Sequence, residues 1–321
     1  MFYDFSSAFN TIKPALLGDK LEQAGVDSHL TMWLLDYLTN RPQFVRAGDC
    51  VSDTVVCSTG APQGTVLAPF LFTLYTADFS HHTTNCHLQK FSDDSAIVGL
   101  ITDGDEEEYR ELNRDFVDWC LLNYLQINAA KTKELVVDFS RNRHTATPVN
   151  IQGTDIEIVD SYRYLGVHLN KKLDWAANTN ALLKKGQSRL HLLRKPTSFG
   201  VQGALLKTFY NSVVASAIMY GVVCWSSSIT AADRKRLNKL IKKASSVLGC
   251  TLDPVEVVGD RRMTTKLLSI MEDASHPLQE TVRSLGSSFS DRLLHPRCLK
   301  ERYRRSFLPA AVRLYNQACS Q

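Results

Sequence analysis

The sequence predicts an α/β protein of the α+β type, in which helices back a mostly antiparallel sheet and a largely helical region follows. Residues 86–100 contain two apolar runs on either side of an adjacent acidic pair, which indicates two strands joined by a tight turn. Apolar positions three to four residues apart indicate amphipathic helices at 14–24, 28–38 and 105–125. Beyond Asp174 the pattern is helical almost throughout.

The acidic pair in the predicted turn is Asp93-Asp94. Two carboxylates at a hairpin tip repel each other unless a divalent cation neutralises them. Asp4 has a similar setting, because residues 1–5 resemble the end of a strand. Three carboxylates at neighbouring strand ends would form an oxygen-rich site for two Mg²⁺ ions, which is the arrangement used for phosphoryl or nucleotidyl transfer. For the pair taken alone, the alternative is an ordinary solvated turn.

The charge is distributed unevenly along the 321 residues, whose formal net charge is +4. Residues 1–160 contain 11 Lys and Arg against 23 Asp and Glu, a net charge of −12. Residues 161–321 contain 26 against 10, a net charge of +16. An acidic half that binds metal and a basic half that binds backbone phosphates suit a nucleic-acid polymerase. Ordinary solvated helices are the alternative for the basic half.

Several features predict an intracellular protein of the nucleus or cytoplasm, without membrane contact. The eight cysteines form no C-x-x-C pair and no pattern with zinc spacing, which indicates free thiols in a reducing compartment. The first residues lack the basic start of a signal peptide. The long charge-free stretch 208–232 contains Asn211 and Gly221, so we expect a buried helix there and no transmembrane helix.

The remaining elements follow from the same rules. We expect a hairpin around Gly48-Asp49, a glycine-containing loop at 60–69 that leads into a helix, a strand at 134–139, a strand pair made of 149–159 and 161–169, and helices at 175–193, 200–225 and 231–248. Near the end, residues 297–305 interleave Arg with Tyr303. This basic stretch suits contact with RNA, a localisation signal or an ordinary exposed helix.

Three motifs occur in a characteristic order: Phe2-Tyr3-Asp4-Phe5-Ser6-Ser7-Ala8-Phe9-Asn10, Gly60-Ala61-Pro62-Gln63-Gly64 and Phe91-Ser92-Asp93-Asp94. Their order, spacing and residues resemble motifs A, B and C of reverse transcriptases, in the non-LTR (LINE-type) retrotransposon branch. The resemblance covers about residues 2–250 and implies a right-hand polymerase. Its parts would be a palm at 1–160, a primer-grip hairpin at 161–170, a basic helical thumb at 171–250, and a basic, partly flexible helical C-terminal region at 251–321.

The resemblance also implies roles for residues near the carboxylates. Asp4 and Asp93 would be shared ligands of two Mg²⁺ ions, for which Mn²⁺ could substitute. Asp94 would ligate less directly, and Phe5 would offer its backbone carbonyl. Phe9 would be the steric gate that disfavours a 2′-hydroxyl, although core packing is the alternative for its ring. The incoming nucleotide would lie against Pro62, Gln63 and Gly64.

Further roles extend from motif D to the thumb. Lys131 would protonate the pyrophosphate leaving group or stabilise its charge, unless it is merely a solvated lysine. The segment containing Tyr162, Tyr164, Leu165 and Gly166 resembles a primer grip, which positions the primer 3′-hydroxyl; a plain hairpin is the alternative. The thumb residues expected to contact duplex phosphates are Lys184, Lys185, Arg189, Arg234, Lys235, Lys239, Lys242 and Lys243.

Departures from the family pattern leave two functions open. Motif A begins almost at residue 1, so we expect the fingers to be largely absent and the endonuclease missing, and Ser92 stands where Ala is more usual. The first function is an RNA-directed DNA polymerase with an RNA template, a DNA primer and dNTPs. The second is a catalytically inactive, truncated remnant that binds RNA or RNA/DNA duplex. The sequence does not fix the oligomeric state.

Overall fold

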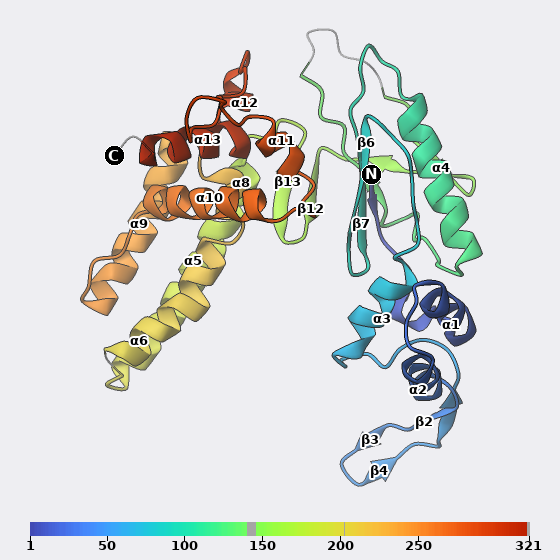
Figure 1. The fold of residues 1–321 in the computed structure, drawn as a ribbon. Helices are drawn as coiled ribbons and strands as arrows, with labels where there is room; N and C mark the ends of the chain where they lie inside the picture. Colours follow the sequence, from blue (N-terminus) through green and yellow to red (C-terminus); the bar gives the residue numbers. More distant parts are fainter. Residues whose placement is uncertain (140–145, 202, 320–321) are drawn as a thin grey trace. The chain divides into compact units, whose positions relative to one another are not determined.

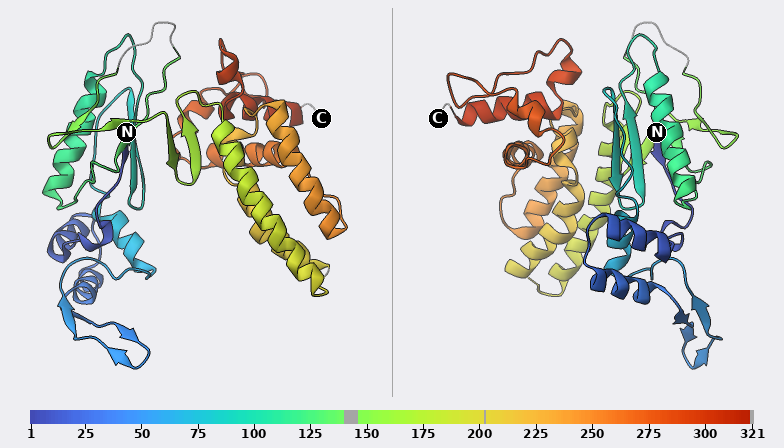
Figure 2. Two further views of the ribbon diagram at one scale, coloured as in Figure 1. Left: turned by 180° about the vertical axis from the view of Figure 1, so that it is seen from behind. Right: turned by 45° about the vertical axis from the view of Figure 1, so that its right-hand side comes forward.

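The computed structural model describes residues 1–139, 146–201 and 203–319, and it contains two compact units, Met1–Leu165 and Gly166–Gln321 (Figures 1 and 2). The first unit contains the main sheet with its helices, and the second is mainly helical. The mixed fold with mostly antiparallel pairing is thereby confirmed. The finer division into palm, primer grip and thumb stays a prediction.

A five-stranded sheet with the order β11-β8-β1-β7-β6 forms the centre of the first unit. The strands are β1 (Phe2–Tyr3), β6 (Cys86–Phe91), β7 (Asp94–Gly99), β8 (Lys133–Glu134) and β11 (Glu157–Ile158). β1 is antiparallel to β7 and β8, whereas β11 is parallel to β8. The hairpin predicted at 86–100 is confirmed as β6–β7, in which Phe91 pairs with Asp94.

One face of this sheet is covered by α4 (Glu107–Leu122), which confirms the amphipathic helix predicted there. Tyr3 points to this face: its ring meets Phe116 edge-on with centroids 4.8 Å apart, and its hydroxyl donates to Asn113 Oδ1 at 2.6 Å. Ile97 of β7 is buried in the same core. Because side chains alternate along a strand, the neighbours of Tyr3 and Ile97 lie on the opposite face.

The first unit contains three further helices, α1 (Pro14–Gln23), α2 (Ser28–Leu38) and α3 (Leu67–Tyr75), in which α1 packs against both α2 and α3. All three confirm predicted helices. The hairpin predicted around Gly48 is also confirmed, since β2 (Arg41–Gln43) pairs with β5 (Val55–Cys57) and β3 (Arg46–Ala47) pairs with β4 (Cys50–Val51).

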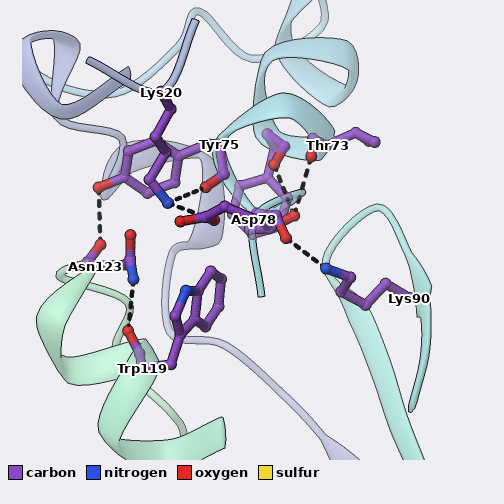
Figure 3. A network of polar contacts seen from close by, with 9 residues as sticks. Lys20, Thr73, Tyr75, Asp78, Lys90, Trp119 and Asn123 are labelled. Carbon is purple, nitrogen blue, oxygen red and sulfur yellow. Dashed lines mark hydrogen bonds and ion pairs between the residues drawn. The ribbon is translucent and has the colours of Figure 1, made fainter. Parts of the chain in front are cut away.

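Two lysines tie these elements together (Figure 3). Lys20 on α1 is only 8% exposed, and its Nζ donates to the Tyr75 carbonyl at 2.8 Å and lies 2.7 Å from Asp78 Oδ1. Its Nζ also lies 5.2 Å from the ring centroid of Trp119 on α4. Lys90 of β6 approaches the same ring and donates to the Thr76 carbonyl. Burial lowers the pKa of Lys90. The network therefore links α1, α3, α4 and β6.

Replacing one of these lysines should cost measurable stability. We expect Lys20→Met to lower the free energy of unfolding by about 1–2 kcal/mol, because the apolar stem remains but the Tyr75 carbonyl and Asp78 lose their donor. The cost stays below that of a fully buried ion pair because the Asp78 side chain is 44% exposed. Urea denaturation measures the change, with the exposed Lys207→Met as control. Equal stability of the two variants would contradict this role.

Two predictions about strands were wrong. The strand predicted at 134–139 is limited to β8, and segments 149–159 and 161–169 do not pair with each other. Instead, β9 (Asn150–Ile151) pairs with β10 (Thr154–Asp155), and β12 (Ser161–Tyr164) pairs with β13 (Val167–Asn170). Each turn has two central residues with positive φ: Gln152 and Gly153 in the first, Leu165 and Gly166 in the second. Such type I′ turns join two neighbouring strands into a hairpin, so each segment forms a hairpin of its own and the two segments do not pair with each other.

The second unit is built from helices. It contains α5 (Ala176–Ser198), α6 (Ala204–Phe209), the π-helix η2 (Tyr210–Ala215), α7 (Ser216–Ile218), α8 (Val222–Trp225), α9 (Ala231–Leu248), α10 (Val255–Glu272), α11 (Gln279–Arg283), α12 (Glu301–Arg304) and α13 (Phe307–Ala318). α5 and α9 confirm predicted helices and pack against each other. The single helix predicted at 200–225 is wrong in detail, because it is interrupted by η2 and by Gly221, whose φ is +59°.

The stretch Ala204–Trp225 is the candidate membrane span among the described residues, by length and composition only. Core helices of soluble proteins pass the same test. Leu206, Val214, Ile218 and Trp225 are all buried in the core of the second unit. Only 33% of the apolar window is buried, however, so the prediction of a buried helix is met in part.

Candidate active site

Strand register brings two of the predicted carboxylates to one edge of the sheet. Phe2 pairs with Ala96 and Tyr3 with Ser95, so the next step of the same antiparallel register places Asp4 opposite Asp94. Asp93 precedes Asp94 in the turn between β6 and β7. Asp4 and Asp94 therefore lie at this edge on the face away from α4, and Asp93 lies beside them in the turn.

Electrostatics supports this grouping. The pKa of the Asp94 carboxyl is raised, first by burial and then by the negative charges of Asp93 and Asp4. Burial also raises the pKa of the Tyr162 hydroxyl, with further contributions from Asp94 and Asp4. The sheet edge therefore concentrates negative charge, and the ring of Tyr162 lies within reach of it.

The surroundings of Asp4 connect the edge to the segment predicted as motif D. The Asp4 backbone N–H donates to Thr132 Oγ1 at 3.2 Å, and its carbonyl accepts from the Asn128 N–H at 2.8 Å. Lys131 Nζ lies 3.9 Å from Asp4 Oδ1, which is too far for a hydrogen bond but close enough for an ion pair. The resemblance placed Lys131 near the reacting phosphates, and the structure brings its ammonium beside the first predicted metal ligand.

Two oxygen atoms near this edge are available to a divalent cation. Asp4 Oδ1 is buried and has no hydrogen-bond donor among the described residues, which leaves a carboxylate oxygen free to ligate. The backbone bridge between Phe5 and Ile127 uses Asp4 O and Ser6 N, so the Phe5 carbonyl lies outside its hydrogen bonds. Within residues 1–139, 146–201 and 203–319, no group of three His, Cys, Asp or Glu side chains is close enough to hold a metal ion. The two-ion site therefore stays a prediction.

The loop predicted as motif B docks directly on the segment that follows Asp4. Gly60 N–H donates to Ile12 O at 2.7 Å, and Ala61 N–H donates to Phe9 O at 2.8 Å. The Gln63 side-chain amide donates to Asn10 Oδ1 at 3.3 Å. A Cβ on Gly60 would lie 2.7 Å from the Asn10 Cα. Only glycine permits this approach, so two motifs 50 residues apart form one surface.

The predicted nucleotide-contacting residues differ in their exposure. Phe9 lies in the 3₁₀ helix η1 (Ala8–Asn10) and is half-buried, with its ring edge-on to Phe72 at a centroid distance of 5.4 Å. Gln63 and Gly64 are exposed, and Pro62 is half-buried. Sequence reasoning missed Asn10, which fixes the Gln63 amide; its position one residue after Phe9 was the available signal.

The predicted primer-grip tyrosines are attached to the first unit through Phe2. The Tyr162 ring stacks on Phe2 with centroids 4.2 Å apart and planes 12° apart, and Tyr164 lies 5.1 Å from the same ring. Phe2 and Asp4 are two residues apart and so share a sheet face. The tyrosines therefore lie on the carboxylate face. Leu165 and Gly166 form the turn described above. The role of Phe2 as their platform was missed from sequence, where it appeared only as a strand residue.

The predicted phosphate-contacting residues are divided between two helices of the second unit. Lys184, Lys185 and Arg189 lie on α5, and the α9 residues are Arg234, Lys235, Lys239, Lys242 and Lys243. Lys239 and Lys243 line a cavity of about 240 Å³ between these helices, together with His191, Arg194 and Arg236, which sequence reasoning had not assigned. Arg234 lines a different cavity.

Clustering of the carboxylates predicts a pH effect. The pKa of Asp94 is higher in the folded chain than in the unfolded chain, so the folded chain binds more protons in the pH range where carboxyl groups titrate. The free energy of unfolding should therefore fall as pH rises through that range. Asp94→Asn removes this penalty and should raise the melting temperature at neutral pH without divalent cation by about 1–2 °C, a small effect because the site is exposed. Thermal denaturation across the acidic range measures it, with Asp53→Asn as control. A variant less stable than wild type at neutral pH would contradict the prediction.

Comparisons with known proteins agree with this geometry. A family model described as reverse transcriptase (RNA-dependent DNA polymerase) matches residues 1–169, more than half of the chain. A second, described as the N-terminal part of alkylated DNA repair protein alkB homolog 8, matches the short segment 175–216.

Curated relatives come from transposons of flies. The probable RNA-directed DNA polymerase from transposon BS of Drosophila melanogaster is 23% identical over 91% of this chain and 32% of its own length. The one from transposon X-element of the same species is 23% identical over 96% of this chain and 35% of its own length. The RNA-directed DNA polymerase from mobile element jockey of Drosophila funebris is 24% identical over 74% of this chain and 26% of its own length.

This chain spans about a third of the length of the first two relatives. The family match nevertheless covers all three motifs and the carboxylate edge. The chain therefore belongs to the reverse transcriptase (RNA-dependent DNA polymerase) family, and its relatives confirm the resemblance to the non-LTR retrotransposon branch of that family.

Proposed function

We propose that this chain is the polymerase core of an RNA-directed DNA polymerase that extends a DNA primer on an RNA template. In this proposal the first unit acts as the palm, and α5 to α9 act as a thumb. The observation that carries it is the meeting of Asp4 and Asp94 through strand register, with Asp93 in the adjoining turn and Lys131 Nζ 3.9 Å from Asp4 Oδ1.

The carboxylates would hold the metal ions. Asp4, Asp93 and Asp94 would hold two Mg²⁺ ions, which would supply Lewis-acid chemistry for transfer of a nucleotide to the primer 3′-oxygen. The buried Oδ1 of Asp4 accepts no hydrogen bond from the described residues and has only the longer ion pair with Lys131, which supports its role as a ligand. The Phe5 carbonyl would complete the oxygen set.

Lys131 would act on the leaving group. Its ammonium is 69% exposed and lies beside the carboxylate edge, so it can reach a triphosphate bound there. It would donate a proton to pyrophosphate, or stabilise the charge that develops as the bond to the α-phosphate breaks.

The surface formed by η1 and the loop 60–64 would receive the nucleotide. Gln63 would contact it through an amide that Asn10 orients, and Pro62 and Gly64 would shape the floor. Phe9 would exclude a 2′-hydroxyl, because Phe72 holds its ring in place. On the same sheet face, Tyr162 and Tyr164 would help to position the primer end.

A second function, binding of RNA or RNA/DNA duplex without catalysis, is favoured by a different observation. The cavity between α5 and α9 is lined by Arg194, Arg236, Lys239 and Lys243, none of which belongs to the carboxylate edge. Such a surface can hold phosphates whether or not the edge is competent.

Primer extension distinguishes the two functions. The purified chain is incubated with an RNA template, a labelled DNA primer and dNTPs, with Mg²⁺ and in parallel with Mn²⁺, and duplex affinity is measured across a salt series. We expect extension that depends on the divalent cation. Absence of extension, together with binding that weakens steeply as salt rises, would overturn the polymerase proposal and support binding alone.

A further inference from the structure

We propose that a second basic cavity, in the second unit, binds a phosphate group of a nucleic-acid strand. The cavity has a volume of about 310 Å³ and is lined by residues from four places: the connection between α8 and α9, the start of α9, the α12 region, and α13. Four of the lining residues are arginines, at 234, 304, 305 and 313. The choice of a nucleic-acid strand rests on the proposed function.

The arginines come from segments far apart in the sequence. Arg234 lies in the first turn of α9, whereas Arg304 and Arg305 lie at the end of α12 and Arg313 lies on α13. The hydroxyls of Ser227 and Ser228 donate to the Arg305 carbonyl at 2.6 and 2.8 Å. These bonds fix the end of α12 against the start of the α8–α9 connection, so the cavity is held together by the fold itself.

The charges around the cavity are only partly balanced. Glu301 pairs with Arg304 at 3.0 Å and with Arg305 at 2.8 Å. Asp260 does not line the cavity but also interacts with the cluster: burial and the charge of Glu256 raise its pKa, and the charges of Arg313 and Arg234 oppose that rise. Four arginines therefore line the cavity together with one carboxylate, that of Glu301, and the excess positive charge suits an anion.

Arg234 provides an independent indication of a missing acceptor. Its Nε is buried, and no hydrogen-bond partner for it exists among the described residues. A buried guanidinium N–H without an acceptor is unfavourable, and an anion in the adjoining cavity would supply one. Guanidinium forks match the oxygens of a phosphate better than they match a single-atom anion. Because residues 161–321 carry a net charge of +16, a polyanionic strand is the occupant that the unit as a whole also attracts.

The test uses the full chain with Arg234→Gln, Arg313→Gln and the double variant. Affinity for a labelled single-stranded RNA is measured by fluorescence anisotropy over a range of salt concentrations. We expect each single variant to bind about 3–10-fold more weakly, with the salt slope shallower by about 0.7 for each phosphate that the variant no longer neutralises. The control is Arg261→Gln on α10, an exposed arginine paired with Asp253 outside the cavity, which should change little. Arg313→Lys keeps the charge and should fall between wild type and Arg313→Gln.

Two further measurements test whether the cavity instead binds free phosphate or an acidic protein. If inorganic phosphate raises the melting temperature of the wild type but not of the double variant, while RNA affinity is unchanged, the cavity binds free phosphate and the strand proposal is overturned. If the variants lose affinity only for poly-glutamate, the partner is an acidic protein and the proposal is likewise overturned. Wild-type affinity and salt slope in all variants would overturn it as well.

The outcome is independent of catalysis. Primer extension at saturating duplex should proceed at the wild-type rate in Arg313→Gln, because Arg313 lies on α13, outside the first unit with its carboxylate edge and outside the helices proposed as the thumb. If wild-type chain fails to extend a primer but the cavity variants still weaken RNA binding, the polymerase proposal fails and the phosphate site stands. The reverse result, normal extension with unchanged RNA binding, removes the phosphate site alone.

Discussion

Asp93→Asn is expected to reduce primer extension by about 10³-fold or more, equivalent to roughly 4 kcal/mol of transition-state stabilisation. The substitution preserves the shape of the turn but removes a charge that the proposed site needs to bind its cations. Because the turn between β6 and β7 is fixed by the pairing of Phe91 with Asp94, the fold should survive. Single-turnover extension at saturating duplex isolates the chemical step from binding.

The control for this variant is Asp49→Asn, which removes an equal charge at an exposed position of the β3–β4 hairpin. It should extend primers like the wild type. Duplex affinity of Asp93→Asn should be unchanged or tighter, because the substitution removes a negative charge near the phosphates. Extension by Asp93→Asn within tenfold of the wild type would show that this carboxylate is not a metal ligand.

Gly60→Ala is expected to produce the largest loss of stability, about 3 kcal/mol or more. Gly60 has a φ of +72°, which strains any other residue, and its new Cβ would lie 2.7 Å from Asn10 Cα and 2.9 Å from Phe9 O. The loop would have to move away from η1, which breaks the bond from Ala61 N–H to Phe9 O. Extension should therefore fall as well.

Gly48→Ala is the matched control for backbone strain, since Gly48 also has a positive φ, of +62°, but no atom lies within 4 Å of the added Cβ. It should cost only about 1 kcal/mol, the strain alone. Chemical denaturation of both variants measures the difference. If both substitutions lower the free energy of unfolding equally, the close approach between the loop and η1 does not contribute to stability.

Much of the first unit could be predicted from local pattern. Alternating and apolar runs around Asp93-Asp94 specified the hairpin, because a two-residue turn with polar residues needs no information from elsewhere in the chain. The amphipathic helices at α1, α2 and α4 followed from helical spacing in the same way. The sequence predicted that Asp4 and the Asp93-Asp94 pair lie at neighbouring strand ends, but not which residues face each other. The register of β1 with β7 places Asp4 opposite Asp94.

Other features depend on contacts between distant segments. Nothing in the local sequence indicates that Lys20 and Lys90 both approach the ring of Trp119, since lysines ordinarily remain exposed. The pairing of β11 with β8 was missed because two-residue strands carry almost no periodic signal. The unpaired Nε of Arg234 likewise becomes visible only once α9 and α13 are folded together.

The most direct test of the account is whether the sheet edge binds divalent cations through Asp4, Asp93 and Asp94 together. Mn²⁺ is titrated into the chain bound to an RNA-template/DNA-primer duplex, and free Mn²⁺ is followed by electron paramagnetic resonance in the wild type and in Asp4→Asn. The account predicts saturable binding in the wild type that Asp4→Asn greatly weakens, although Asp4 is 89 residues from Asp93. Identical binding curves for the two proteins would contradict it.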